Sequence, residues 1–186
     1  MRTSQLTDRL ESSPVIAAIR DNKWQAALGS PAEVLFYLEP HLSTICEKVK
    51  QAHEAGKLIF IHLDMAEGIG KDKEGVQYLA QCGVDGIIST RSQIIRFAKD
   101  LELLTVQRFF ALDSQGLDSI QEMLKSSHPH FMELMPGIIP KVVRRFASGP
   151  IPVIAGGLIE EKTEITNALG SGALAVSTGR EELWYL

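Results

Sequence analysis

Short apolar runs alternate with longer amphipathic stretches along nearly the whole chain. The clearest case lies in 152–179, where residues 153–155 and 173–176 are apolar runs and 160–169 has helical spacing. Apolar runs this short are typical of parallel strands that are covered on both faces. The pattern recurs with a period of roughly 20–25 residues, as expected for repeated strand-then-helix units.

The same pattern predicts eight strands with helices between them. The expected strands are 15–20, 34–38, 57–63, 85–89, 103–109, 131–135, 153–155 and 173–176. Eight such units predict an α/β fold, a compact (β/α)8 TIM barrel with short loops, forming one domain over residues 1–186. An open doubly wound sheet is the alternative, but it more naturally has five or six strands.

Helix ends are signalled by capping residues and glycines. Asp72, Thr90 and either Asp113 or Ser114 stand where N-caps are expected.

The clearest apolar stripe predicts a helix over 41–55. Its members are Leu42, Ile45, Cys46, Val49 and Ala52.

The composition limits the class of protein but does not indicate a function. The chain is 45% hydrophobic and carries a net charge of −4, so no global basic field indicates nucleic acid. Cys46 and Cys82 lack metal-ligand spacing, which predicts reduced core residues of a cytoplasmic protein. The first residues lack an apolar signal-peptide core, and no apolar run approaches the roughly 18–20 residues of a membrane span.

Glycine-bearing turns are expected after each of the last two strands. The residues concerned are Gly156, Gly157, Ser177, Thr178 and Gly179. Glycine lets backbone N–H groups approach a ligand closely, and N–H groups near a helix N-terminus suit an anion. Barrels of this class commonly bind phosphate after strands seven and eight, so a phosphate site is predicted here. The alternative is that the glycines only form tight turns.

Polar residues on the predicted strands form a second candidate group. In a barrel both faces of a strand are buried, so a polar side chain there needs a partner or a function. Residues predicted to converge on the upper barrel are Arg20, His62, Asp64, Gln107 and Glu133. They predict a pocket for the non-phosphate end of a small ligand. The alternative is a set of buried pairs that satisfy one another.

Several catalytic patterns are absent from the sequence. No lysine lies in the body or at the carboxyl end of a predicted strand, so a Schiff-base aldolase has no evident nucleophile. There is no nucleophile elbow, HExxH or CxxC motif. Proton transfer by Glu133 or His62 stays open as an alternative. Asp64, Glu67 and Glu133 lack diagnostic metal spacing, and no metal site is assigned.

Motifs over about 14–184 resemble a known family. They are PVIAAIRD, HLDMAEGIGKD, GVDGIISTRS, LLTVQR, ELMPGIIPKV, IPVIAGGLI and ALAVSTGREELW. Together they resemble the glycerol uptake operon antiterminator regulatory proteins, which are glycerol-3-phosphate-responsive antiterminators. The run MPGIIPKV with IAGGLI and AVSTG is quite specific, whereas IAGG alone would match many phosphate-binding barrels.

The resemblance implies a regulator without catalytic residues or cofactor. Such a protein is expected to bind glycerol 3-phosphate and then the leader messenger RNA of glycerol-catabolism operons, preventing premature termination. On this chain the glycine turns would hold the phosphate. The other pocket candidates are Arg20, His62, Asp64, Glu133 and Lys141. A phosphosugar isomerase or lyase that uses Glu133 as base is the alternative.

Two basic clusters are candidates for an RNA surface. Lys141, Arg144 and Arg145 belong to one predicted helix, and Arg91, Arg96 and Lys99 to another. The alternative is that both are solvated helix faces, since the sequence has no recognisable RNA-binding motif. A homo-oligomer that joins patches from several subunits is a further hypothesis.

Overall fold

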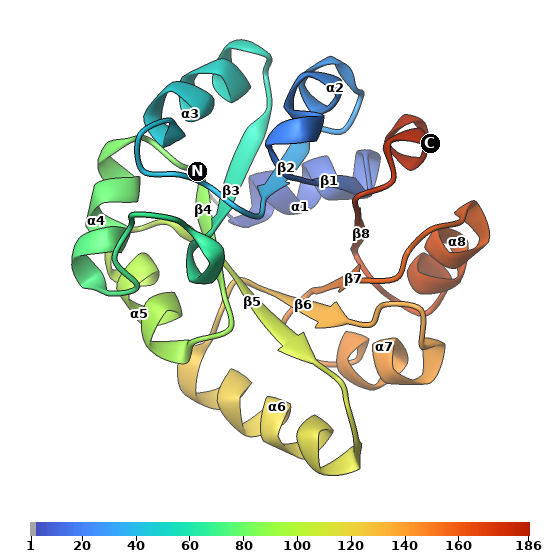
Figure 1. Ribbon diagram of the computed structural model, residues 1–186. Coiled ribbons are helices and arrows are strands. Elements are labelled where there is room, and N and C mark those ends of the chain that lie inside the picture. The colour runs from blue at the N-terminus through green and yellow to red at the C-terminus, as the bar shows by residue number, and fades with distance from the viewer. Residues whose placement is uncertain (1–2) are drawn as a thin grey trace.

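The strands form a closed parallel barrel in the order β1 to β8, as Figure 1 shows. This computed structural model describes residues 3–186; residues 1 and 2 of the predicted domain lie outside the described residues. The strands are β1 (Val15–Ile19), β2 (Val34–Tyr37), β3 (Leu58–His62), β4 (Gly86–Ser89), β5 (Leu104–Phe110), β6 (Phe131–Met135), β7 (Val153–Gly156) and β8 (Ala175–Thr178). The predicted (β/α)8 barrel is confirmed.

A helix follows each of the first seven strands on the outside of the barrel. The α-helices are α1 (Thr3–Ser12), α2 (Trp24–Gly29), α3 (Ile45–Glu54), α4 (Lys73–Gln81), α5 (Ser92–Asp100), α6 (Ser114–Ser127), α7 (Pro140–Ala147) and α8 (Lys162–Gly170). Three 3-10 turns are η1 (Asp21–Lys23), η2 (Leu63–Met65) and η3 (Glu181–Tyr185). The last of these takes the position after β8 where a final helix would stand.

The interior is apolar in its lower part. Side chains two residues apart on each strand point inward. The lower interior consists of Ile16, Val34, Phe36, Leu58, Phe60, Ile88, Leu104, Val106, Phe131, Ile154 and Ala175. Helix α1, which lies behind the strands in Figure 1, adds Leu6 and Leu10 to this cluster, each 1% exposed. The N-terminal helix therefore closes the amino-terminal end of the barrel.

Asp72 and Asp113 cap their helices as predicted. Their carboxylates accept hydrogen bonds from the N–H groups of Gly75 and Gly116, three residues on. The prediction for Thr90 is wrong, because α5 starts at Ser92 and its N-cap makes no side-chain bond. The Thr90 hydroxyl and N–H both donate to Asp64 instead, and that contact fixes the loop after β4.

Two predicted boundaries were wrong in ways that matter. Helix α3 starts at Ile45, not at residue 41, because the preceding turn is tied to the β3–α4 loop by the His41–Glu67 bridge. Leu42 is therefore 41% exposed and leaves the apolar stripe. Strand β8 begins two residues late, at Ala175, so Ser177 and Thr178 belong to the strand and not to the turn after it.

The prediction of two reduced core cysteines was also wrong. Cys46 on α3 and Cys82 at the end of α4 are joined by a disulfide, with Cα atoms 4.7 Å apart. Cys46 is exposed and Cys82 is only partly buried. Within residues 3–186, no helix is long and apolar enough to cross a membrane, and no group of three acidic, histidine or cysteine side chains could hold a metal.

Candidate functional site

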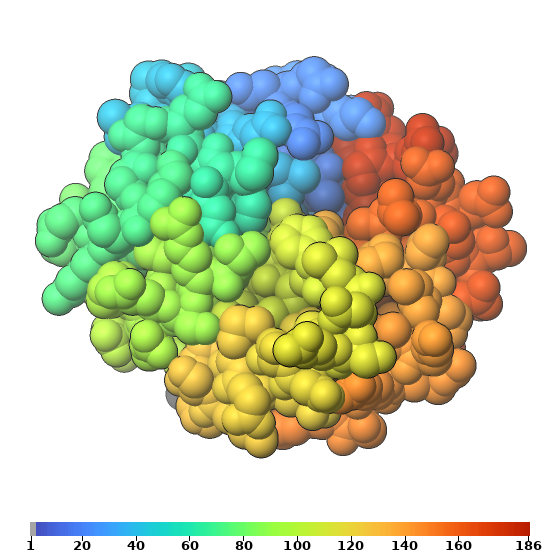
Figure 2. All heavy atoms as spheres, turned by 60° about the horizontal axis from the view of Figure 1, so that its bottom comes forward, coloured from blue at the N-terminus to red at the C-terminus, as the bar shows by residue number. Residues whose placement is uncertain are grey.

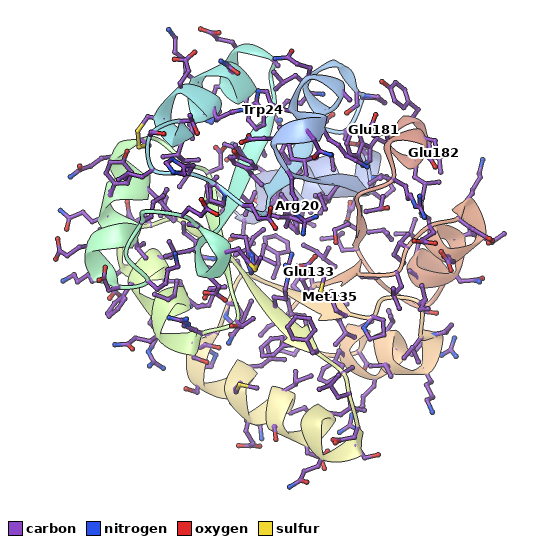
Figure 3. All side chains as sticks on the ribbon, in the orientation of Figure 1. Arg20, Trp24, Glu133, Met135, Glu181 and Glu182 are labelled. Atoms are coloured by element: carbon purple, nitrogen blue, oxygen red, sulfur yellow. A yellow bond between two sulfur atoms is a disulfide. The ribbon has the colours of Figure 1, made fainter. Side chains whose placement is uncertain are left out.

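A polar layer lies above the apolar interior, at the carboxyl ends of the strands. The register places Arg108 of β5 beside Glu133 of β6, and Gly156 of β7 beside Ser177 of β8. Arg108 Nε donates to Glu133 Oε2 at 2.6 Å, and Ser177 Oγ donates to Glu133 Oε1 at 2.6 Å. Glu133 is fully buried, and Figure 3 shows it near the middle of the barrel. Both of its carboxylate oxygens are engaged.

The side of β5 that faces inward differs from the prediction. Gln107, expected in the pocket, points outward, where it bonds Ser92 of α5 and Ser127 of α6. Arg108 takes the inward position because it follows Leu104 and Val106 at a spacing of two. It is 7% exposed, and its Nη2 atom has no hydrogen-bond partner within residues 3–186.

A small pocket opens above Arg108, with a volume of about 210 Å³. Its lining residues are Ala18, Arg20, Leu38, Arg108, Met135, Gly157, Leu158, Ile159, Ser177, Thr178 and Gly179. Four of the five residues predicted to hold phosphate therefore meet at this pocket. They come from the ends of β7 and β8, which are neighbours in the barrel.

Gly156, the fifth predicted phosphate residue, has a different position. A Cβ there would lie 2.5 Å from Ser177 Oγ and 2.6 Å from Glu133 Oε1. Gly156 therefore leaves room for the Glu133 carboxylate below the pocket and does not line the pocket itself. A bulky residue at 156 would disturb the polar layer as well as any bound ligand.

The turn after β7 has the backbone conformation that glycine favours. Gly157 has φ +75° and Leu158 has φ +60°, and Leu158 is 64% exposed. The N–H of Gly137 donates to Gly156 O at 2.6 Å, so the loop after β6 supports this turn from outside. The Thr178 hydroxyl donates to Ile159 O at 2.7 Å and links the turn to β8.

Cationic side chains surround the mouth of the pocket. Arg20, a predicted pocket residue, lines it and pairs with Glu39 at 2.7 Å. Figure 3 shows Arg20 on the β1 side of Glu133. Lys23 Nζ donates to the carbonyl of Gly179 at 2.6 Å, and Arg180 pairs with Glu160 at 2.8 Å. Each of these cations is paired with a glutamate, and Arg20 is the one of the three that lines the pocket.

The N-terminus of α8 is not available to an anion, contrary to the expectation from sequence. Glu161 and Glu164 form a capping box there. The Glu164 carboxylate accepts the N–H groups of Glu160 and Glu161 at 2.7 and 2.9 Å. The helix dipole is thus already compensated by the chain's own glutamate.

His62 lies in the polar layer beside Arg108 but below the pocket lining. It is 4% exposed, and neither ring nitrogen has a hydrogen-bond partner within the described residues. Burial, together with the nearby Arg108 charge, lowers the pKa of His62 to about 4. The ring is therefore neutral near pH 7.

Of the five predicted pocket residues only Arg20 lines the pocket; His62, Asp64, Glu133 and Lys141 do not. Asp64 accepts bonds from Ser89 Oγ and from Thr90 at 2.6–2.8 Å. Burial alone would raise the pKa of Asp64, but these bonds outweigh it and lower the pKa. Lys141 lies exposed in the first turn of α7. Asp64 therefore holds the β4–α5 loop, and Lys141 stays outside the pocket.

The predicted RNA-binding residues lie on helices that α6 separates. Arg91, at the start of α5, lies 4.0 Å from Asp64. Further along α5, Arg96 contacts Ser126 on α6 at 3.4 Å. On α7, Arg145 pairs with Asp118 of α6 at 2.6 Å, and Arg144 contacts Ser171 at 3.4 Å. The two clusters thus both touch neighbouring helices, and Figure 2 shows α5, α6 and α7 side by side.

Sequence reasoning missed Arg108 and Lys23 as site residues. Counting in twos places Arg108 on one face with Leu104 and Val106, but both faces of β5 are buried, so the sequence did not tell which face points inward. Lys23 gave no local signal, because it belongs to a turn and reaches Gly179 across 156 positions of sequence. Only the closing of β1 against β8 brings the two together.

The fold places the chain among the compact (β/α)8 barrels with a polar pocket at the carboxyl end. More particularly, the chain belongs to the glycerol-3-phosphate-responsive antiterminator family, whose model matches residues 15–184. The resemblance seen in the sequence motifs is thereby confirmed.

Individual relatives cover nearly the whole chain. The Escherichia coli protein YgcP is 34% identical over 181 residues, which span 95% of this chain and 94% of that protein. A glycerol uptake operon antiterminator regulatory protein from Listeria monocytogenes is 35% identical, covers 91% of this chain and 94% of its own, and has a TM-score of 0.87. An antiterminator-related protein from Thermotoga maritima is 29% identical, covers 92% and 98%, and has a TM-score of 0.83.

More distant barrels include aldolases, a decarboxylase and an epimerase. They share 9–15% identity with this chain. Likeness at this level shows the fold alone.

Proposed function

We propose that this protein is a glycerol-3-phosphate-responsive antiterminator that binds its effector in the pocket above Arg108. Ligand binding favours a state that binds the leader messenger RNA of glycerol-catabolism operons. The observation that carries the proposal is the Arg108 guanidinium, which is 7% exposed yet has an unpartnered Nη2 atom and lines the pocket. A buried donor without a partner is costly, so a ligand oxygen at this position would relieve that cost.

The phosphate belongs, in this proposal, at the turns after β7 and β8. Gly157 and Gly179 line the pocket with backbone and no side chain, and Leu158, which follows Gly157, has an exposed side chain. Glu164 already accepts N–H groups at the N-terminus of α8, so that helix dipole is not free for the phosphate. Arg20 and Lys23 provide positive charge at the mouth in its place. Charge-assisted hydrogen bonds of this kind are roughly twice as strong as neutral ones.

The glycerol end would lie deeper, against the polar layer. Arg108 Nη2 is a donor for a hydroxyl oxygen, and Ser177 lines the pocket beside it. A volume of about 210 Å³ suits a three-carbon ligand better than a six-carbon sugar phosphate. The pocket therefore selects for a short ligand.

The geometry supports a sensor more than an enzyme. Glu133, the base in the alternative hypothesis, is fully buried and is not among the residues that line the pocket. A general base needs a lone pair within reach of the proton that it removes. The residues lining the pocket include no lysine that could form a Schiff base. We accordingly propose that the protein needs no cofactor and acts in the cytoplasm, where messenger RNA is made.

Calorimetry and mobility shift together test the proposal. Glycerol 3-phosphate should release heat with one site per chain, whereas glycerol and inorganic phosphate should each bind far more weakly. Leader RNA should shift only when glycerol 3-phosphate is present. Nuclear magnetic resonance of the ligand after prolonged incubation should show no product. Turnover of the ligand would instead support the isomerase or lyase.

A pair of glycine variants locates the site. Gly157→Ala places a Cβ on a turn with φ +75° and should weaken glycerol 3-phosphate binding by about tenfold or more. Gly56→Ala is the matched control, because Gly56 has φ +74°, stands at the end of α3 and has nothing within 4 Å of its added Cβ. Equal affinity of both variants would contradict the proposed phosphate position.

A further inference from the structure

A groove lies on the outer wall between α6 and α7, near the amino-terminal ends of β6 and β7. Its volume is about 540 Å³, larger than the pocket at the mouth. Its apolar walls come from Leu124, Pro129, Met132, Phe146 and Ile151. It lies at the end of the barrel opposite to the proposed effector site, because these residues precede or flank the starts of β6 and β7. The effector therefore does not occupy it.

The rim of this groove is cationic. Lys125, His128 and Arg145 line it. The flat Arg145 guanidinium lies beside the apolar lining, and Phe146, which is only 5% exposed, belongs to the floor of the groove. An apolar slot with a guanidinium beside it is the combination that stacks nucleic-acid bases.

Of the two basic clusters of the sequence, only Arg145 lines this groove, while two cations of α5 contact the end of α6 beside it. Lys99 Nζ of α5 donates to the carbonyl of His128 at 2.5 Å, and Arg96 contacts Ser126. The end of α6 thus links the α5 cations to Lys125 and, across the groove, to Arg145 on α7. We call Arg96, Lys99, Lys125 and Arg145 the basic band.

The distribution of charge along the sequence is also uneven, and the segment that contains the basic band is the more positive part. Residues 91–150 contain eight lysines and arginines against six acidic residues, a net charge of +2. The remainder of the chain has eleven against seventeen, a net charge of −6. A polyanion would be attracted more to the surface formed by this third of the chain than to the remainder.

The cations of the rim are available to phosphates. Lys125 pairs with Glu122 and Arg145 with Asp118, but both carboxylates are exposed, at 73% and 75%. Ion pairs with carboxylates this exposed are weak and are readily exchanged. A phosphate between the two cations would therefore replace weak contacts.

We propose that single-stranded leader RNA binds along the basic band, with one base in the groove between α6 and α7. This inference rests on the proposed function and identifies the surface that binds the RNA. A base fills the apolar slot against the Arg145 guanidinium, while the flanking phosphates contact Lys125 and Lys99. The band explains how an acidic protein binds a polyanion: it uses one face only. A second copy of the chain or a protein partner lacks the phosphates that match this charge.

The test uses two variants of the full chain and a matched control. Lys125→Gln/Arg145→Gln removes two rim charges, and Ser148→Trp fills the groove at a lining residue without changing charge. Lys50→Gln/Lys73→Gln removes two exposed charges from α3 and α4, away from the groove. Leader RNA binding is measured with saturating glycerol 3-phosphate over a range of salt concentrations. Effector affinity is measured separately by calorimetry, and self-association by size-exclusion chromatography.

The rim variant should bind RNA at least tenfold more weakly, with the slope of log affinity against log salt reduced by about two. The groove-filling variant should lose affinity with an unchanged slope, and the control should match the wild type. Effector affinity should be unchanged in all three variants.

Wild-type RNA affinity in both groove variants would overturn this inference and leave the proposed function intact. Wild-type protein that fails to bind leader RNA would refute the proposed RNA function. A change of oligomeric state in the groove variants would assign the groove to a second copy instead.

Discussion

The two halves of the barrel interior are built on opposite principles. The lower half is a continuous apolar core that α1 closes with Leu6 and Leu10. The upper half, only one side-chain layer away, buries the Arg108–Glu133 ion pair and the unpartnered ring of His62. Both halves use the same strands and the same alternation of side chains. The lower layers stabilise the fold, whereas the upper layer keeps polar atoms buried at a cost.

The difference indicates where this fold carries its function. Buried ion pairs contribute little net stability, because desolvation of both charges offsets their attraction. An unpartnered buried donor is a further cost. Such groups are expected at a ligand site, and here they lie directly under the pocket. Variants in the two halves should accordingly separate stability from ligand binding.

Removing the charge of Glu133 should have the largest effect on stability. Glu133→Gln leaves the Arg108 guanidinium buried without a counter-ion, which costs roughly 3–5 kcal/mol in the free energy of unfolding. Urea denaturation followed by circular dichroism measures the change. A loss below about 1 kcal/mol would mean that the upper layer is not a dry, tightly coupled site.

Truncating the α1 plug should cost nearly as much but leave the pocket intact. Leu10→Ala removes a side chain that is 1% exposed and leaves a cavity, at a cost of roughly 2–5 kcal/mol. Urea denaturation measures the loss, and calorimetry at 15 °C checks glycerol 3-phosphate affinity, which should stay within about twofold. A large loss of affinity would break the separation between the two halves.

The neutral His62 ring should make stability depend on pH. Its pKa is about 4 in the folded state against 6.5 for an ordinary histidine, so the unfolded chain binds more protons between these values. The free energy of unfolding should therefore fall as pH drops from about 6.5 to about 4, by up to roughly 3 kcal/mol from this group. His62→Leu should flatten that part of the curve. Parallel pH curves for both proteins would contradict the burial of a neutral ring.

Arg20 should give the smallest effect on stability. Its ion pair with Glu39 is exposed at 56% and 40%, so Arg20→Ala should change the free energy of unfolding by less than about 1 kcal/mol. Glycerol 3-phosphate affinity should nevertheless fall by about tenfold, because the mouth loses a cation. Calorimetry on this variant and on Arg9→Ala, whose pair with Glu33 is likewise exposed, separates the two effects.

Much of the fold could be predicted because the sequence carries local signals for it. Strand β6 matched its predicted bounds, since His130 and Pro136 flank a run of apolar residues broken only by Glu133. The caps at Asp72 and Asp113 followed from side-chain chemistry. The helix start at residue 41 was wrongly predicted because Leu42 continues the apolar spacing of α3. In the structure the bridge between His41 and Glu67 keeps this turn outside the helix.

The site was harder to predict for a physical reason. A strand buried on both faces has no apolar–polar alternation to tell inside from outside, so Gln107 and Arg108 are equivalent in composition. Only the register with β6 decides that Arg108 meets Glu133. Long-range contacts such as Lys23 with Gly179 depend on barrel closure, so local sequence patterns do not predict them.

Calorimetry of glycerol 3-phosphate on the double variant Arg108→Met/Glu133→Leu tests the central claim most directly. Replacing a buried ion pair by apolar side chains is often neutral or stabilising, so the variant should be about as stable as the wild type in urea. Without Arg108 Nη2 at the pocket floor, it should bind glycerol 3-phosphate at least a hundredfold more weakly. A folded double variant with wild-type affinity would contradict the account, because the polar layer would then have no part in binding the effector.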